Sequence, residues 1–86
     1  MGIDMKVTSP EALSTAIKNA RHQKNLSQQA TAARVGVKQA TVSSFENHPE
    51  KSRIETLFKL LSALDLELRV VERGVPDSAN GWSEEW

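Results

Sequence analysis

Two short helices separated by a single glycine constrain this chain more than any other feature of its sequence. The stretch LSQQATAARVGVKQATVSSFEN, residues 26–47, predicts a helix over 28–35 behind an N-cap serine, Ser27. Gly36 follows where that helix must stop and where the backbone needs a positive φ. A second helix is predicted over 38–46. The apolar side chains expected to pack the two helices together are Ala32, Val35, Val37, Val42 and Phe45.

Small polar side chains begin the second helix. Such a helix fits the major groove of B-DNA, where its amide and hydroxyl groups can bond base edges. The predicted base-reading residues are Lys38, Gln39, Ala40, Ser43 and Ser44. The stretch is therefore predicted to be a DNA-binding helix-turn-helix. The alternative is a small helical protein of another kind, because any such protein can join two short helices through a glycine.

Charge is segregated along the chain, although the formal net charge is zero. Between Lys18 and Arg53, seven basic residues stand against only Glu46 and Glu50, which leaves this block at +5. From Gly74 onward there are three acids and no base. Only the basic block needs to face phosphates, so the zero total does not argue against nucleic acid. The alternative is chance clustering on a solvated surface.

A chain of 86 residues is expected to form one domain, whose core is marginal without help. It has no cysteine, which excludes disulfides and cysteine zinc sites, so oligomerisation is the remaining help. His22 and His48 are expected at the surface rather than on a metal, and no cofactor is expected. No paired acids, nucleophile–histidine pairing or phosphate loop suggests an enzyme. With no membrane-spanning run or signal peptide apparent, a cytoplasmic, nucleoid-associated protein is expected.

Residues 1–8 carry no clear pattern and are expected to be an N-terminal arm, followed by a domain over 9–73. Ser9 and Pro10 predict a helix start, with a cap and a proline at the first helical position. Ser52 and Glu55 have the spacing of a capping box that opens a later helix. The apolar face of this later helix is wide enough to cover the helix-turn-helix and leave surface for a second subunit.

The period of the sequence changes from 3.6 to 2 over residues 66–71, which predicts a β-strand. A single strand has no ladder partner within its own chain, so we expect it to pair with the same strand of a second copy across a two-fold axis. The predicted dimer interface consists of Leu61, Leu64, Leu66, Leu68 and Val70. The alternative, an extension of the preceding helix, is disfavoured by the consecutive valines Val70 and Val71.

Residues 74–86 are rich in Gly, Pro, Ser, Asn and acids and are expected to be a disordered acidic tail. The chain's two tryptophans, Trp82 and Trp86, lie in this tail. Tryptophan is a common anchor in a partner's pocket, so the pair predicts a protein-binding segment. The alternative is that the aromatic rings fold back on the domain.

Residues 26–47 resemble the helix-turn-helix of the Xre/Cro/phage-repressor family, and residues 9–66 cover that family's helical core. The resemblance is closer still to the HipB antitoxins of HipA/HipB toxin–antitoxin modules. It is carried by Ser9-Pro10, by VKQATVS at 37–43 with FEN at 45–47, by the strand at 66–71 and by the final Glu85-Trp86.

This resemblance implies a mainly α, four-to-five-helix, lambda-repressor-like domain whose C-terminal β-strand forms an intersubunit two-stranded lid in a homodimer. It also implies a repressor that binds inverted-repeat operators of its own operon and neutralises a HipA-type serine/threonine kinase toxin, on which Trp86 would dock. The alternative is a stand-alone Xre-type repressor with no toxin partner. Thr31 departs from the family's Leu, so either its methyl suffices or partner residues fill the space.

Residue roles follow from the same resemblance. Gln39 would pair with adenine, Lys38 with guanine, and the Ala40 methyl would contact a thymine methyl. Gln28 would bond a phosphate through its side chain and the helix N-terminus together. The predicted phosphate contacts are Ser27, Gln28, Thr41, Asn47 and Lys51. Glu46 is expected to stay within the fold, bonding backbone or a neighbouring base such as Arg34.

Overall fold

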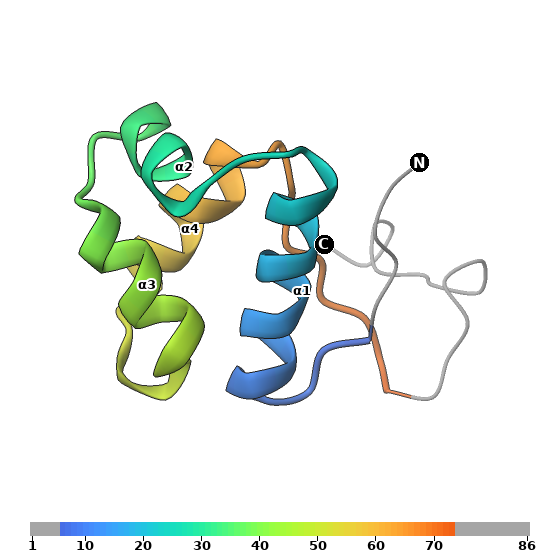
Figure 1. Cartoon of the computed structure of the whole chain (residues 1–86). Coiled ribbons are helices and arrows are strands. Elements are labelled where there is room, and N and C mark those ends of the chain that lie inside the picture. Colours follow the sequence, from blue (N-terminus) through green and yellow to red (C-terminus); the bar gives the residue numbers. More distant parts are fainter. Residues whose placement is uncertain (1–5, 74–86) are drawn as a thin grey trace.

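The computed structural model describes residues 6–73, which form four α-helices and one 3₁₀ turn (Figure 1). The elements are α1 (Pro10–Gln23), α2 (Gln28–Arg34), α3 (Gln39–Asn47), η1 (Pro49–Lys51) and α4 (Ile54–Ala63). α3 packs against both α1 and α2, and α4 packs against α2. The predicted mainly α architecture is confirmed. None of the helices over 6–73 is long and apolar enough to span a membrane.

Serine side chains begin the first two helices, as predicted. The Ser9 hydroxyl accepts a hydrogen bond from the Ala12 N–H at 3.0 Å, and the Ser27 hydroxyl accepts one from the Ala30 N–H at 2.9 Å. Each bond satisfies one of the backbone donors that a helix leaves without a partner in its first turn. The start of α2, and hence the position of the helix-turn-helix, is set locally.

Three of the helices end in the same way. At each end a residue with positive φ is followed by an apolar residue, whose N–H bonds to the carbonyl five residues earlier at 2.8–3.1 Å. This is the Schellman arrangement, in which the apolar residue packs back on the domain. The pairs are Asn25-Leu26, Gly36-Val37 and Asp65-Leu66. The predicted turn at Gly36 is confirmed, with φ of 70°.

The core lies where the inner faces of all four α-helices meet. Its largest members are Phe45 from α3, Ile17 from α1, and Leu60 at the centre of α4, each at most 2 % exposed. The buried apolar residues are Ile17, Ala20, Ala32, Val42, Phe45, Leu57, Leu60, Leu61, Ala63 and Leu64. Val35 is not among them. Because Val42 and Phe45 anchor α3 by one side, its opposite side faces outward.

Thr31 is fully buried within the chain's own core. Its hydroxyl donates to the Ser27 carbonyl at 2.9 Å, so the polar group is satisfied inside α2. The first of the two explanations therefore holds: the threonine is accommodated without a partner subunit.

The predicted capping box at α4 is wrong. The Leu57 N–H bonds to the Arg53 carbonyl at 3.1 Å, which makes Arg53 the N-cap, and no side chain caps this helix. Ser52 lies one residue too early, because its N–H closes η1 by bonding to the Pro49 carbonyl at 3.1 Å. Its hydroxyl is therefore placed beside α3 instead of over the first turn of α4 (described below).

The apolar face of α4 is divided between the core and the surface. Leu61 and Leu64 are 6 % and 0 % exposed, so the chain's own core takes up two residues predicted at the dimer interface. Ile54 and Phe58, by contrast, are 69 % and 51 % exposed. The apolar surface that α4 offers to a partner is thus displaced toward its N-terminal half.

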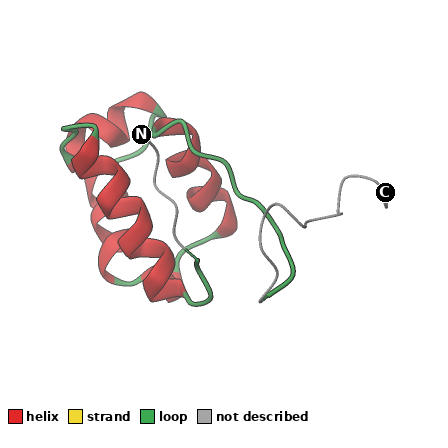
Figure 2. Cartoon of the chain, turned by 90° about the vertical axis from the view of Figure 1, so that its right-hand side faces the viewer, coloured by secondary structure: helices red, strands yellow, loops and turns green. Residues whose placement is uncertain are grey.

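Residues 66–73 continue as an extended segment without helix or strand assignment, drawn as loop in Figure 2. The alternative that this segment prolongs α4 is wrong, because α4 ends at Ala63 and Asp65 has φ of 57°. Leu66 packs against the core, whereas Leu68 and Val70 are 50 % and 69 % exposed. No strand forms among residues 6–73 of the single chain, so the predicted ladder needs a partner. The predictions for residues 1–5 and 74–86, including Trp82 and Trp86, lie outside the described residues.

Candidate nucleic-acid interface

The outward side of α3 carries the predicted base-reading residues. Lys38, which is the N-cap, and Gln39, Ala40 and Ser44 are exposed, and Ser43 is half-buried. Gln39 and Ser43 are four residues apart, as are Ala40 and Ser44, which places these four on one side of the helix, and Lys38 directly precedes them. No bulky apolar side chain interrupts this surface. The arrangement suits close approach to a flat or grooved partner.

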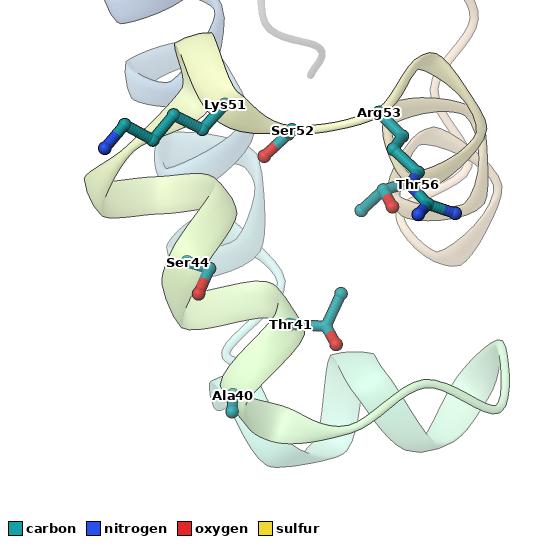
Figure 3. A pocket seen from close by; sticks show the side chains of 7 residues that line it. All are labelled: Ala40, Thr41, Ser44, Lys51, Ser52, Arg53 and Thr56. Carbon is teal, nitrogen blue, oxygen red and sulfur yellow. The ribbon is translucent and has the colours of Figure 1, made fainter.

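A groove of about 300 Å³ runs beside this surface, between α3 and the start of α4 (Figure 3). Two cationic and four hydroxyl side chains line it, and no acid does. The lining residues are Ala40, Thr41, Ser44, Lys51, Ser52, Arg53 and Thr56. Hydroxyl donors combined with Lys and Arg form the usual set for phosphate oxygens. The groove can therefore hold an anionic backbone next to α3.

Sequence reasoning found only part of this groove. Thr41 and Lys51 were predicted as phosphate contacts, and the structure brings them together. Ser52, Arg53 and Thr56 were missed, because the stretch from Ser52 was interpreted as a helix cap. The available signal was the pair of bases, Lys51 and Arg53, on either side of a serine directly before a helix.

The other predicted phosphate contacts make bonds of their own. The Ser27 hydroxyl oxygen accepts the capping bond at the start of α2. Asn47 donates through Nδ2 to the Ser43 hydroxyl oxygen at 3.2 Å, along one side of α3. The hydroxyl hydrogen of Ser43 is still available to donate outward.

Gln28 and Gln39 begin the two helices of the motif and bond to each other. Nε2 of Gln39 donates to Oε1 of Gln28 at 2.6 Å, and Nε2 of Gln28 donates to Oε1 of Glu46 at 3.0 Å. A predicted phosphate contact and a predicted base-reading residue are therefore joined directly. Neither side chain is free to rotate without breaking a hydrogen bond.

A buried ion pair lies behind the glutamines. Nε and Nη2 of Arg21 donate to the two carboxylate oxygens of Glu46 at 2.7 and 3.0 Å, with side-chain exposures of 8 % and 2 %. Arg21 also donates through Nη1 to the Leu26 carbonyl at 2.8 Å, which ties α1 and the α1–α2 turn to α3. Glu46 stays within the fold as predicted. The prediction that Arg34 is the basic partner of Glu46 was wrong, because Nη1 of Arg34 donates to the Ala63 carbonyl at 2.9 Å.

Burial alone would raise the pKa of the Glu46 carboxyl. The hydrogen bonds from Arg21 and Gln28, together with the positive charges of Arg21 and Lys18, outweigh burial and hold the pKa below its ordinary value of 4.5. Glu46 is therefore a carboxylate at neutral pH, and it can only accept hydrogen bonds. Within residues 6–73, no three metal-ligating side chains gather at one place.

Comparison with known proteins gives the family. Residues 17–71 match the helix-turn-helix family. Antitoxin HipB of Escherichia coli K12 is 36 % identical over 83 residues, which cover 94 % of each chain. The structure superposes on a complex of a HipB variant with an O2 20mer at a TM-score of 0.80 and 37 % identity, covering 83 % of this chain and 99 % of that one. For the HipA–HipB–O2–O3 complex the TM-score is 0.79 at 37 % identity, with coverage of 81 % and 99 %. The chain therefore belongs to the helix-turn-helix family and, within it, to the HipB antitoxins.

Proposed function

We propose that this protein is a sequence-specific DNA-binding repressor and antitoxin, which binds an inverted-repeat operator of its own operon and neutralises a HipA-type serine/threonine kinase. The observation that carries the DNA part is the outward side of α3 with the cationic groove beside it. Solved structures of HipB proteins with this fold include a complex with an O2 20mer and a HipA–HipB–O2–O3 complex, which supports DNA and a HipA-type protein as partners here. Such a protein acts at the nucleoid.

In this proposal α3 enters the major groove of DNA. Its amide, ammonium and hydroxyl groups face base edges, and the Ala40 methyl is placed for contact with a thymine methyl. Lys51 and Arg53, with the hydroxyls of the groove, hold the adjacent phosphates and set the register of α3. The phosphate contacts supply most of the affinity, whereas Lys38 and Gln39 supply sequence preference.

We further propose that the protein is a homodimer joined by a two-stranded lid. Residues 66–71 form neither helix nor strand in the single chain, and three of their side chains, Leu68, Val70 and Val71, leave apolar area uncovered. Ile54 and Phe58 on α4 add to the exposed apolar area. Unpaired backbone and apolar side chains both favour a second copy as partner. A two-fold dimer would place two α3 helices about 34 Å apart, one turn of DNA.

The toxin-binding part of the proposal is assigned to residues 74–86, with Trp86 and Trp82 as anchors. The basic block is engaged by DNA in this scheme, which leaves the acidic tail for a protein partner. Deleting 74–86 should weaken capture of the HipA-type kinase of the same operon and leave operator affinity largely intact. If deletion changes neither, the stand-alone repressor is the better account.

The test of DNA reading starts from a pool of random duplexes selected on the wild-type protein. Fluorescence anisotropy with the enriched duplex then compares Gln39→Ala with Gln23→Ala, which truncates an exposed glutamine at the end of α1. Gln39→Ala should lower affinity about 5- to 150-fold and relax preference at one base position, as expected for a lost base contact of about 1–3 kcal/mol. Equal effects of the two substitutions would refute base reading by Gln39.

A further inference from the structure

A row of hydrogen bonds leads from the buried ion pair to the surface of α3. It starts at the carboxylate of Glu46, passes through the amide of Gln28 at 3.0 Å and ends at the amide of Gln39 at 2.6 Å. Glu46 is buried, Gln28 is half-buried and Gln39 is exposed. The row therefore joins a group with a fixed charge in the interior to a group that faces the proposed DNA partner.

The interior end of the row can act only as an acceptor. Both oxygens of Glu46 accept from Arg21, and Oε1 accepts from Gln28 as well. A carboxylate has no hydrogen to donate, so the end of the Gln28 amide that faces it must be the NH₂ group. The opposite arrangement would place two acceptor oxygens against each other.

The polarity then passes outward. With its NH₂ directed at Glu46, Gln28 presents its oxygen to Gln39, and the end of the Gln39 amide that faces this oxygen must be its NH₂ group. The Oε1 atom and the second N–H of Gln39 are left for another partner. The hydrogen bond to Gln28 therefore fixes which side of the Gln39 amide carries the oxygen and which carries the N–H.

We propose that Glu46 is a positioning residue for sequence readout, which fixes the orientation of the Gln39 amide through Gln28. Bidentate recognition of adenine needs an oxygen opposite the N6 amine and an N–H opposite N7, so only one orientation of the amide fits a given edge. The relay selects that orientation before DNA arrives. This inference rests on the proposed function and deepens it.

Glu46→Gln is the informative substitution, because an amide at this position can donate to Gln28 and reverse the row. An amide free to take both orientations halves the competent population, so preference at the Gln39 base pair should fall at least about twofold. A fully reversed row should lower it about tenfold, the loss expected for about 1.4 kcal/mol of base discrimination. Gln28→Ala breaks the row while sparing the ion pair, and should lower preference at the same base pair.

Base preference is measured as the ratio of affinities for the selected duplex and its single-base variants. Because it is a ratio, it does not change with the fraction of protein that is folded. Leu57→Ala removes a buried side chain of α4 outside the row and serves as the destabilised control, which should keep the wild-type ratio. In a Gln39→Ala background, Glu46→Gln should cause no further change at that base pair.

A second readout needs no DNA. The side-chain NH₂ resonances of Gln39 in ¹⁵N–¹H spectra should move toward those of a free glutamine in both Gln28→Ala and Glu46→Gln. Resonances that stay in place, or affinity lost equally for all single-base variants, would overturn the relay and leave Glu46 with only its structural pairing. A wild-type protein that enriches no duplex at all would instead refute the proposed function.

Discussion

Removing Arg21 from the buried ion pair should be among the most damaging single changes in this domain. Arg21→Met leaves the Glu46 carboxylate, with a side chain 2 % exposed, facing only the Gln28 donor. It also leaves the Leu26 carbonyl without its 2.8 Å bond at the α1–α2 turn. Breaking a buried pair on one side costs about 3–5 kcal/mol, a large part of the about 5–15 kcal/mol that holds a whole domain together.

Urea unfolding at pH 7, followed by far-ultraviolet circular dichroism at fixed protein concentration, measures this cost. Lys59→Met is the matched control, because it breaks an exposed pair with Glu55 at 3.8 Å and should change stability by less than about 1 kcal/mol. The double substitution Arg21→Met/Glu46→Leu replaces both charges by apolar groups and should be more stable than Arg21→Met alone. The reasoning would be refuted if Arg21→Met lowered the free energy of unfolding no more than Lys59→Met does. It would also be refuted if the loss in Arg21→Met/Glu46→Leu equalled the sum of the losses in the two single variants.

The remaining predictions follow from other elements of the domain. The pKa of Glu46 in the folded protein lies below 4.5, so its stabilising effect is complete above the unfolded pKa and is lost as the pH falls through the folded pKa. The free energy of unfolding of Glu46→Gln should therefore fall less steeply with acid than that of the wild-type protein. Gly36→Ala should cost about 1–2 kcal/mol through its φ of 70° alone, since nothing lies within 4 Å of the added Cβ; a calorimetric midpoint that does not fall would contradict this. Arg53→Ser should lower affinity for all duplexes alike and reduce the slope of log affinity against log salt by about the amount of one phosphate contact. A loss of affinity that depends on the base sequence would contradict a phosphate contact by Arg53. Phe58→Glu should shift sedimentation toward the monomer, and an unchanged dimer would exclude this surface.

The local signals of the sequence predicted the motif well. A serine before α2 and a glycine after it are short-range features, and each acts through backbone groups within a few residues. The ends of α1 and α4 were harder to place, because Asn25 and Asp65 adopt the positive φ that glycine adopts most readily. In both cases the apolar residue that follows was the better signal.

The long-range features could not be predicted in the same way. Glu46 is separated from Arg21 by 25 positions, and several other basic residues lie nearer to Glu46 in the sequence. Only the packing of α1 against α3 decides which base it meets. The groove likewise depends on η1, which ends at Lys51 and leaves Ser52 and Arg53 between η1 and α4, where both line the groove.

The central claim is that two copies of this chain present their α3 helices to successive major grooves of one DNA site. Two measurements on one sample test the claim directly. Sedimentation equilibrium of the full chain with the selected duplex, at micromolar concentration, gives the number of chains per duplex, and sequencing of that duplex gives the symmetry of the site. The account predicts two chains per duplex and an inverted repeat whose half-sites lie about 10 base pairs apart. One chain per duplex, or an enriched sequence without two-fold symmetry, would contradict it.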